Sequence, residues 1–532
     1  MQSLALPSMQ AEQFRQLQNQ LRDRWQSIDQ FDTAAYDVLV VPSLSLDQRE
    51  LHKVTGIHHY EERLLFSLIR LRNPNTRIIY VTSQPIHPSV IDYYLQLLPG
   101  VPISHARNRL LLLCTYDSSL KPLTQKILER PRLMARIRQV MRCDNSYITC
   151  FNSTHLERDL SLQLGIPLLA LDPDLLYWGT KSGSREIFQE SETPHPDGSD
   201  LVQSPTDLAA VAADLWERQP TLQRMVIKLN EGFSGQGNAL LDLRSLQSVA
   251  PGHASTAART EALHQHFQNL SFQSRTETWD NFSSKIPELG AIAEAFLEGE
   301  EKRSPSVQCR ITPHGKVEIL STHDQILGGP DGQIFLGCRF PADEVYRMRL
   351  QDYGYRVGKV LAEKGALERF SVDFLAIPNP DAEGGWELQA IEINLRKGGT
   401  THPFMALKLL TQGYYDLDTG LFYSQKGNPK YYVATDNLQS DRYIGLLPDD
   451  LMDIVAHHRL HFNSVSETGN AFHLIGCLSE FGKVGLTSIG NSPLQAEELY
   501  NQVVQALDDE TQEQGNSSIA LTPPLTWGNG QY

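Results

Sequence analysis

Two apolar segments late in the chain each carry an acidic residue where a buried strand is predicted. Residues 370–376 contain Asp373, and residues 388–394 contain Glu392 and end at Asn394. Because side chains alternate between the two faces of a strand, Glu392 and Asn394 share a face, and Asp373 joins them if the strands pair. Two carboxylates and an amide oxygen suit Mg²⁺. The pattern therefore predicts a divalent-cation site on a sheet.

A pair of edge strands with solvated acids is the alternative interpretation. The neighbours of Glu392, however, are Ala390, Ile391 and Ile393. A carboxylate buried among such residues is costly unless a cation or strong hydrogen bonds compensate for the lost water. The cation site is the favoured interpretation.

The composition excludes several classes of protein. A chain of 532 residues corresponds to about two to four domains. Its net charge of −16 argues against a general nucleic-acid binder, which would carry a basic patch. The six cysteines form no CxxC pair, so free thiols are expected rather than a zinc site or disulfides. No signal-peptide pattern or long apolar run is present, so a cytoplasmic protein without membrane contacts is expected.

Apolar strands alternate with helices in the first third of the chain, after an amphipathic helix within residues 9–31. The predicted strands are 38–41, 77–81, 109–114, 147–150 and 166–169. Continuous apolar strands separated by helices predict a parallel, doubly wound sheet. No GxGxxG motif follows the first strand, so a bound dinucleotide is not expected.

A glycine-rich loop at residues 230–238 connects two predicted strands, 225–229 and 239–243. Glycines let backbone N–H groups approach a phosphate closely, and Lys228 beside the loop can neutralise phosphate charge. The loop lacks the Gly-Lys-Ser/Thr of a P-loop and leads into a strand, which excludes a Walker site. A plain hairpin turn is the alternative.

These elements, with Lys181 upstream and an acidic apolar segment at 292–301, resemble the ATP-grasp superfamily over residues 179–425. The layout of the whole chain resembles the peptide ligases of pheganomycin biosynthesis and their relatives. The resemblance implies an α/β protein with a Rossmann-like pre-ATP-grasp domain, an ATP-grasp fold of two α+β subdomains gripping ATP, and a small α+β C-terminal domain. The expected units are an N-terminal helix at 1–35, the pre-grasp domain at 36–178, the ATP-grasp domain at 179–425, the C-terminal domain at 430–507 and a disordered tail at 508–532.

The resemblance also implies roles for individual residues. The phosphate-contacting lysines would be Lys181 and Lys228, and the tip of the phosphate-covering loop would be Ser234, Gly235, Gln236 and Gly237. The main chain at Glu294, Ala295 and Leu297 would meet adenine, and Glu301, with Glu300 as the alternative, would bind ribose. The metal ligands would be Asp373, Glu392 and Asn394.

The turn after Asn394 is where related ligases place main-chain N–H groups near the acyl-transfer centre, here Gly398, Gly399 and Thr400. Many related ligases carry an Arg two residues before the first metal-binding Asp, and this chain has Ser371 there. Three other arginines are alternatives for the missing charge: Arg396, Arg310 and Arg369.

The activity implied by the resemblance is ATP-dependent carboxylate–amine ligation through an acyl phosphate. ATP and Mg²⁺, or Mn²⁺ in its place, would be the cofactors, and a small-molecule carboxylate and an amine, such as an amino acid or peptide, the substrates. Neither nucleic acid nor a membrane is expected as a partner, and a homodimer is expected because dimers are common. The alternatives are a carboxylase or small-molecule kinase on the same fold, or a nucleotide-binding regulatory protein without turnover.

Overall fold

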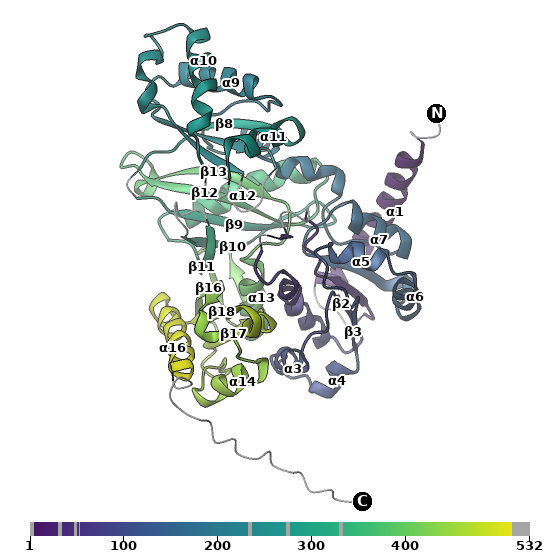
Figure 1. Cartoon of the computed structure of the whole chain (residues 1–532). Helices are drawn as coiled ribbons and strands as arrows, with labels where there is room; N and C mark the ends of the chain where they lie inside the picture. The colour runs from purple at the N-terminus through teal and green to yellow at the C-terminus, as the bar shows by residue number, and fades with distance from the viewer. Residues whose placement is uncertain are drawn as a thin grey trace, which may run out of the picture.

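The computed structural model of the chain describes residues 5–29, 34–46, 51–52, 54–231, 237–272, 277–299, 301–328 and 334–512. Three sheets organise the molecule (Figure 1): a parallel sheet near the N-terminus, a small antiparallel sheet and a ten-stranded sheet that continues to the C-terminal region. Within the described residues, no helix combines the length and the apolar character that crossing a membrane requires.

The first sheet has four parallel strands in the order β3-β2-β1-β4. The strands are β1 (Asp37–Val41), β2 (Arg77–Thr82), β3 (Leu110–Cys114) and β4 (Ser146–Cys150). β1 is buried along its whole length, as a strand covered on both faces must be. This sheet is the predicted doubly wound layer. The strand expected at residues 166–169 is reduced to one bridge, between Ile148 and Leu168.

Helices cover both faces of this parallel sheet. They are α1 (Ala5–Asp29), η1 (Ile57–Arg72), α3 (Pro88–Gln96), α4 (Ile103–Arg107), α5 (Leu123–Leu128), α6 (Pro131–Val140) and α7 (His155–Leu164). Residues of α1, α5, α6 and α7 share a core with one face, and residues of η1 and α3 with the other. Residues 123–140 form two helices and not one, because Pro131 cannot continue a helix and instead begins α6.

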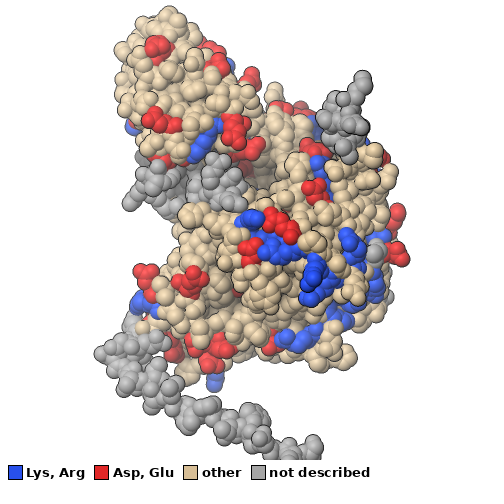
Figure 2. All heavy atoms as spheres, turned by 45° about the vertical axis from the view of Figure 1, so that its right-hand side comes forward, with Lys and Arg blue, Asp and Glu red and all other residues tan. Residues whose placement is uncertain are grey.

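The small sheet has the antiparallel order β7-β6-β5-β8 and stands out from the body as a separate lobe (Figures 1 and 2). Its strands are β5 (Arg224–Leu229), β6 (Asn238–Asp242), β7 (Ser271–Phe272) and β8 (Ala291–Ala295). One core joins it to α9 (Pro205–Arg218), α10 (Thr256–His266) and α11 (Trp279–Leu289). β5 and β6 form the hairpin predicted around the glycine-rich loop.

The large sheet begins with the strand order β13-β12-β9-β10-β11-β16. Its strands are β9 (Ser304–Ile311), β10 (Val317–Gly328), β11 (Ile334–Phe340), β12 (Glu368–Pro378), β13 (Trp386–Asn394), β14 (Tyr414–Asp416), β15 (Leu421–Tyr423), β16 (Pro429–Gln439), β17 (Gly469–His473) and β18 (Lys483–Gly490). The helices α8 (Lys181–Glu190) and α12 (Arg347–Glu363) share a core with β9, β12 and β13. The two predicted acid-bearing strands are therefore neighbours.

The C-terminal region extends this same sheet. β16 pairs with β11 on one side and with β18 on the other. Residues 424–428 form a tight turn between β15 and β16, in which the Gly427 N–H donates to the Ser424 carbonyl. The helices here are α13 (Thr401–Thr411), α14 (Pro448–His457), α15 (Leu478–Phe481) and α16 (Pro493–Gln512). The boundary near residue 425 stays a prediction.

Short 3₁₀ turns connect the main elements: Cys143–Asn145, Pro173–Gly179, Arg244–Val249, Phe267–Asn269, Glu383–Gly385, Asp441–Tyr443 and Ile475–Cys477. Helix α16 includes residues 508–512 of the expected tail, and the remainder of that tail lies outside the described residues.

One hydrophobic core joins the parallel sheet to the C-terminal strands. Val38 and Tyr80 belong to the same buried cluster as Leu438, Leu486 and Phe472. The parallel sheet and the C-terminal strands are thereby fixed relative to each other, and both regions flank the cavity described below.

Shortening one side chain in this shared core tests its importance. Leu486→Ala removes a side chain that is 0% exposed, and we expect it to lower the free energy of unfolding by about 2–5 kcal/mol. The matched variant Leu494→Ala, on a residue 67% exposed, should change it by about 0.5 kcal/mol or less. Urea denaturation followed by circular dichroism measures both, and equal effects of the two would contradict a shared core.

Candidate functional site

A cavity of about 1430 Å³ is lined by residues of the small sheet, of the large sheet and of segments that connect the strands of the parallel sheet. The small sheet contributes Lys228 and Glu294, and the large sheet contributes Asp373 and Glu392. The pre-grasp region contributes Arg63. Residues more than 300 positions apart in the sequence thus face one space, and most of the predicted site residues are among them.

The register of β12 against β13 brings the predicted metal ligands together. Asp373 lies opposite Glu392, and Ser371 lies opposite Asn394. The Asn394 amide nitrogen donates to Asp373 Oδ2 at 2.9 Å, and Gln325 Nε2 on β10 donates to Asp373 Oδ1 at 2.9 Å. The carboxylates and the Asn394 carbonyl oxygen are hard oxygen donors, a set that fits Mg²⁺. Gln325 was missed from the sequence, because one glutamine among the polar and apolar residues of β10 forms no motif.

The two neighbouring carboxylates titrate very differently. Burial and the adjacent Glu392 charge raise the pKa of Asp373 to about 7. Burial also raises the pKa of Glu392, but the nearby Lys181 ammonium outweighs burial and holds that pKa below its usual value. Lys181 Nζ lies 2.7 Å from Glu392 Oε2. A cation bound here would relieve the repulsion between the carboxylates, which is a second reason why this donor set fits one.

Lys181 owes its position to the start of α8. It is the first residue of that helix, and Thr180 caps the helix by accepting a hydrogen bond from the Gly183 N–H. The Lys181 N–H donates to the Asn230 carbonyl at 3.0 Å, and the Ser182 N–H donates to the Asn230 side chain at 2.9 Å. Asn230 directly follows β5, so the lobe holds the helix that carries this lysine.

The second predicted lysine, Lys228, lies on β5 and is buried. Its ammonium pairs with the Glu294 carboxylate on β8. Arg185 Nη1 approaches the other oxygen of that carboxylate at 3.4 Å. Glu294 therefore fixes the direction of Lys228, while Ser234, Gly235 and Gln236 lie outside the described residues. The Gly237 carbonyl accepts a hydrogen bond from the Leu229 N–H, which closes the β5–β6 hairpin.

The segment after β8 offers a main-chain donor to the cavity. The Ala295 and Phe296 N–H groups already donate to the carbonyls of Asp197 and Arg224. Leu297 also lines the cavity, and its N–H has no acceptor among the residues that the structure describes. Leu297 is therefore the best placed of the predicted hinge residues to meet a base.

The predicted ribose ligand lies just beyond this hinge. Glu301 is 56% exposed, accepts a hydrogen bond from Arg303 Nε at 3.0 Å and does not line the cavity, whereas Arg303 does. The alternative, Glu300, lies outside the described residues. The Phe296 ring stacks between Arg224, 4.0 Å from the ring centroid, and Lys302, at 3.8 Å.

The turn from Leu395 to Thr400 is held against the pre-grasp sheet. Lys397 Nζ donates to the Cys150 carbonyl at 2.7 Å, and the Lys397 N–H donates to the Phe151 carbonyl at 3.1 Å. Gly399 packs so closely on Phe335 that an added Cβ would lie 2.6 Å from the ring, so a larger residue would require the ring to move. The Gly398 N–H donates to Thr401 Oγ1. The N–H groups of Gly399 and Thr400, at the start of α13, have no acceptor among the residues that the structure describes.

Of the three alternative arginines, Arg396 lines the cavity and the other two do not. Burial lowers the pKa of Arg396, and the carboxylates of Glu392 and Asp373 oppose that change. Arg310 forms ion pairs with Asp29 at 2.8 Å and with Glu318 at 2.5 Å. Arg369 donates to the Met405 sulfur at 3.1 Å, and burial lowers its pKa to about 10. The geometry therefore favours Arg396.

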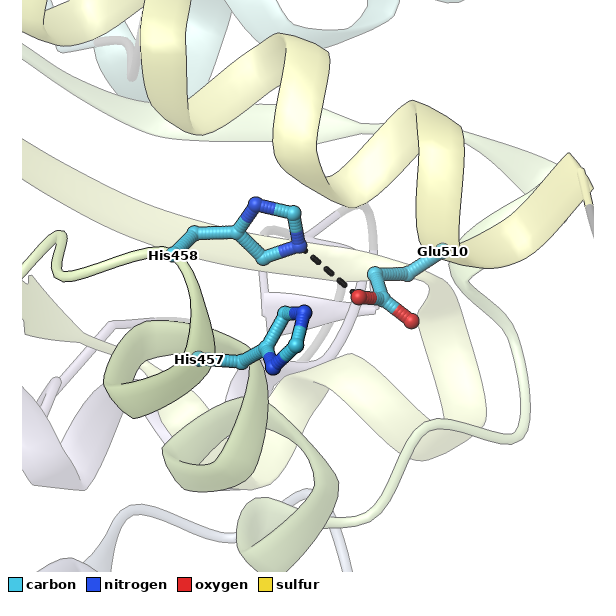
Figure 3. A group of neighbouring side chains, drawn as sticks. All are labelled: His457, His458 and Glu510. Atoms are coloured by element: carbon cyan, nitrogen blue, oxygen red, sulfur yellow. Dashed lines mark hydrogen bonds and ion pairs between the residues drawn. The ribbon is translucent and has the colours of Figure 1, made fainter.

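A surface group outside the cavity also has metal-ligand chemistry. His457, His458 and Glu510 gather where α14 and α16 end (Figure 3). His458 Nε2 lies 2.8 Å from a Glu510 carboxylate oxygen. Their side chains are exposed or half-buried, and this pairing accounts for the cluster without a metal ion.

Comparisons with known proteins bear out the resemblance. Residues 175–418 match a family model described as IQCH-like ATP-grasp, and residues 450–503 match one described as the PGM1 C-terminal domain. The chain is 29% identical over 477 residues to L-propargylglycine--L-glutamate ligase of Streptantibioticus cattleyicolor. The aligned region covers 88% of this chain and 93% of that protein. The predicted resemblance to ATP-grasp proteins is confirmed over residues 175–418.

A second relative is longer than this chain. The chain is 25% identical over 453 residues to IQ motif-containing protein H of Danio rerio. The aligned region covers 76% of this chain and 42% of that protein. Among solved structures, the biotin carboxylase domain of 2-oxoglutarate carboxylase from Hydrogenobacter thermophilus aligns with a TM-score of 0.52, 13% identity and coverage of 90% of this chain and 95% of that chain. This likeness concerns the fold, and it confirms the predicted fold class.

The pKa of Asp373 makes stability depend on pH. The pKa of Asp373 is raised from 3.8 to about 7 by folding, so the folded state binds this proton more tightly than the unfolded state does. The resulting contribution to the free energy of unfolding is complete below pH 3.8 and is lost as pH rises through 7. Asp373→Asn cannot ionise, so at pH 8, without ligands, we expect it to be more stable than the parent by about 1–4 kcal/mol. Urea denaturation at pH 5 and pH 8 measures the difference, which should shrink at the lower pH.

The matched control is Asp352→Asn, whose carboxylate is 52% exposed and pairs with Arg356 on α12. An exposed pair contributes about 0–1 kcal/mol. If the stabilities of the parent and of Asp373→Asn run parallel between pH 5 and pH 8, the carboxylate pair does not titrate as described.

Proposed function

We propose that this protein is an ATP-dependent ligase that joins a carboxylate to an amine and releases ADP and phosphate. The observation that carries the proposal is the convergence of two lysines, two carboxylates and one arginine on a single cavity between the lobe and the large sheet. Cations and oxygen ligands in one cavity suit a nucleotide triphosphate with its metal ion. The similarity over most of the chain to a ligase supports C–N bond formation.

The lobe and α8 would hold the nucleotide. Lys181 and Lys228 would contact its phosphates, and Ser234 to Gly237 would cover them. The main chain from Glu294 through Ala295 to Leu297 would meet adenine, with Leu297 as the donor. Glu301 would bind ribose only after its ion pair with Arg303 breaks. These roles rest on the distances above and on the resemblance.

Asp373, Glu392 and Asn394 would hold Mg²⁺, which neutralises phosphate charge when it is bound. The protein's own task is then to position the reactants and to stabilise charge. A carboxylate oxygen of the first substrate attacks the γ-phosphorus, the bond from that phosphorus to the β-phosphate oxygen breaks, and ADP leaves. Lys181, beside Glu392, is placed to balance charge on the transferred group.

The turn at residues 396–400 would serve the second step. The amine nitrogen attacks the acyl carbon, the carbon–oxygen bond to phosphate breaks, and the nitrogen loses a proton. The negative charge that develops on the acyl oxygen needs donors that are already in place. The start of α13 presents N–H groups of Gly399 and Thr400, and Arg396 adds a positive charge beside them.

The metal assignment predicts the effect of one substitution. Glu392→Gln removes a carboxylate that Lys181 and the metal ion would share, and we expect ADP formation to fall by at least about 10³-fold while the fold is kept. Glu387→Gln, on the same strand but away from the cavity, is the control and should keep the parent rate. Coupled assays measure the rate of ADP formation by the two variants, and circular dichroism checks their fold. Turnover at the parent rate in Glu392→Gln would contradict the metal assignment.

The activity itself is tested by supplying ATP, Mg²⁺ and pairs of carboxylic acids and amino acids, including L-glutamate. ADP and phosphate release should require both partners, and mass spectrometry should find the amide. A stable phosphorylated product would identify a kinase instead. Absence of ADP across a broad panel would leave a nucleotide-binding protein without turnover.

A further inference from the structure

The cavity continues past the turn at residues 396–400 into an end that the proposed nucleotide site does not use. This end lies between η1 and the strands β16 and β18. Its lining residues are Tyr60, Arg63, Asp436, Asn437, Gln439 and Lys483. Arg396 lines the same cavity, and the charges of Glu392 and Asp373 at the metal site and of Arg63 at this end all act on it.

The arginine of this end already has a partner. Arg63 Nη2 lies 3.2 Å from Asp436 Oδ2, and His473 Nε2 lies 2.7 Å from the other oxygen of the same carboxylate. The Arg63 guanidinium also packs 4.8 Å from the centroid of the Phe151 ring. Asp436 thereby neutralises Arg63, and neither charge is left over for a ligand.

Lys483 is different. Its side chain is 4% exposed, and its ammonium donates a hydrogen bond to the Tyr60 hydroxyl at 2.9 Å. Within the described part of the chain, no carboxylate oxygen lies within 4.0 Å of Lys483 Nζ. Pairing of Lys483 with Gln439 in the sheet fixes its backbone, so the ammonium is held at the cavity.

The other buried lysines show how this protein normally satisfies such a charge. Each of them has a carboxylate oxygen within 4.0 Å or two oxygen acceptors: Lys126, Lys181, Lys228, Lys397 and Lys430. Burying an ammonium group without an opposite charge is costly. Among the described residues, the Lys483 ammonium group has one hydroxyl as its hydrogen-bond partner and lies at the cavity wall, which suits an anion that arrives with a substrate.

We infer that Lys483 and Tyr60 bind a non-reacting carboxylate of the amine substrate, which is therefore an amino acid or a peptide with a free carboxylate. This inference rests on the proposed function. The amine adds to one face of the planar acyl carbonyl, so it must approach from a part of the cavity that the nucleotide leaves open. Since the phosphate lies with Lys181 and Glu392, the amine substrate occupies the end beyond Arg396, where Lys483 lies.

Binding of the twenty L-amino acids, measured by calorimetry with Mg²⁺ and a non-hydrolysable ATP analogue, tests the inference. The tightest-binding amino acid is then compared with the amides formed from each of its carboxylates. We expect the parent to bind the acid at least tenfold more tightly than one of these amides. Lys483→Met should bind the acid at least tenfold more weakly than the parent and should no longer distinguish the acid from that amide.

Two further variants separate binding from folding. Tyr60→Phe keeps the ring and removes the hydroxyl, so a smaller loss of affinity for the acid is expected. Lys426→Met, at an exposed lysine bound to the carbonyls of Ser464 and Val465, should match the parent. Lys483→Met should keep or raise the thermal midpoint, because it removes a buried charge.

The inference is overturned if no amino acid binds, if the parent does not distinguish acid from amide, or if Lys483→Met still does. The ligase proposal fails separately. If the parent distinguishes the acid from its amide but releases no ADP, the carboxylate subsite is retained and ligation is rejected. If ADP is released but acid and amide bind equally, ligation is retained and the carboxylate subsite is rejected.

Discussion

The antiparallel register of β12 and β13 is the constraint on which the site depends. It sets Asp373 directly opposite Glu392, so two acids share one face of a largely buried sheet. Lys181 compensates for Glu392 at 2.7 Å, while Asp373 takes a raised pKa. A shift of one residue in either strand would turn one carboxylate into the core. The apolar residues that alternate with these acids fix the register and therefore the site.

The chain links this sheet to the pre-grasp region through the turn that follows β13. Lys397 is buried, and its bonds to the Cys150 and Phe151 carbonyls tie the turn to the end of β4. Arg396 and Gly399 are thereby held at the wall of the cavity. The shared core of the parallel sheet and the C-terminal strands holds η1 and β18 on either side of the far end. Three regions of the chain thus build one cavity.

The sequence was sufficient to predict features encoded by local pattern. Strand alternation placed Glu392 and Asn394 together, and the fold class followed from motif order. Features that depend on distant contacts could not be predicted. Lys483 and Arg63 belong to no motif, and they meet only because β18 pairs with β16 and η1 packs beside them. Arg310 carried the right charge, but Asp29 and Glu318 engage it away from the cavity.

The central claim is that the substrate carboxylate attacks the γ-phosphate of ATP in this cavity. It is tested most directly with a carboxylate substrate labelled with ¹⁸O in both oxygens, in the presence of ATP, Mg²⁺ and the amine. Transfer through an acyl phosphate predicts that labelled oxygen appears in the released phosphate and that ADP remains unlabelled. Unlabelled phosphate, or label in AMP, would contradict the account.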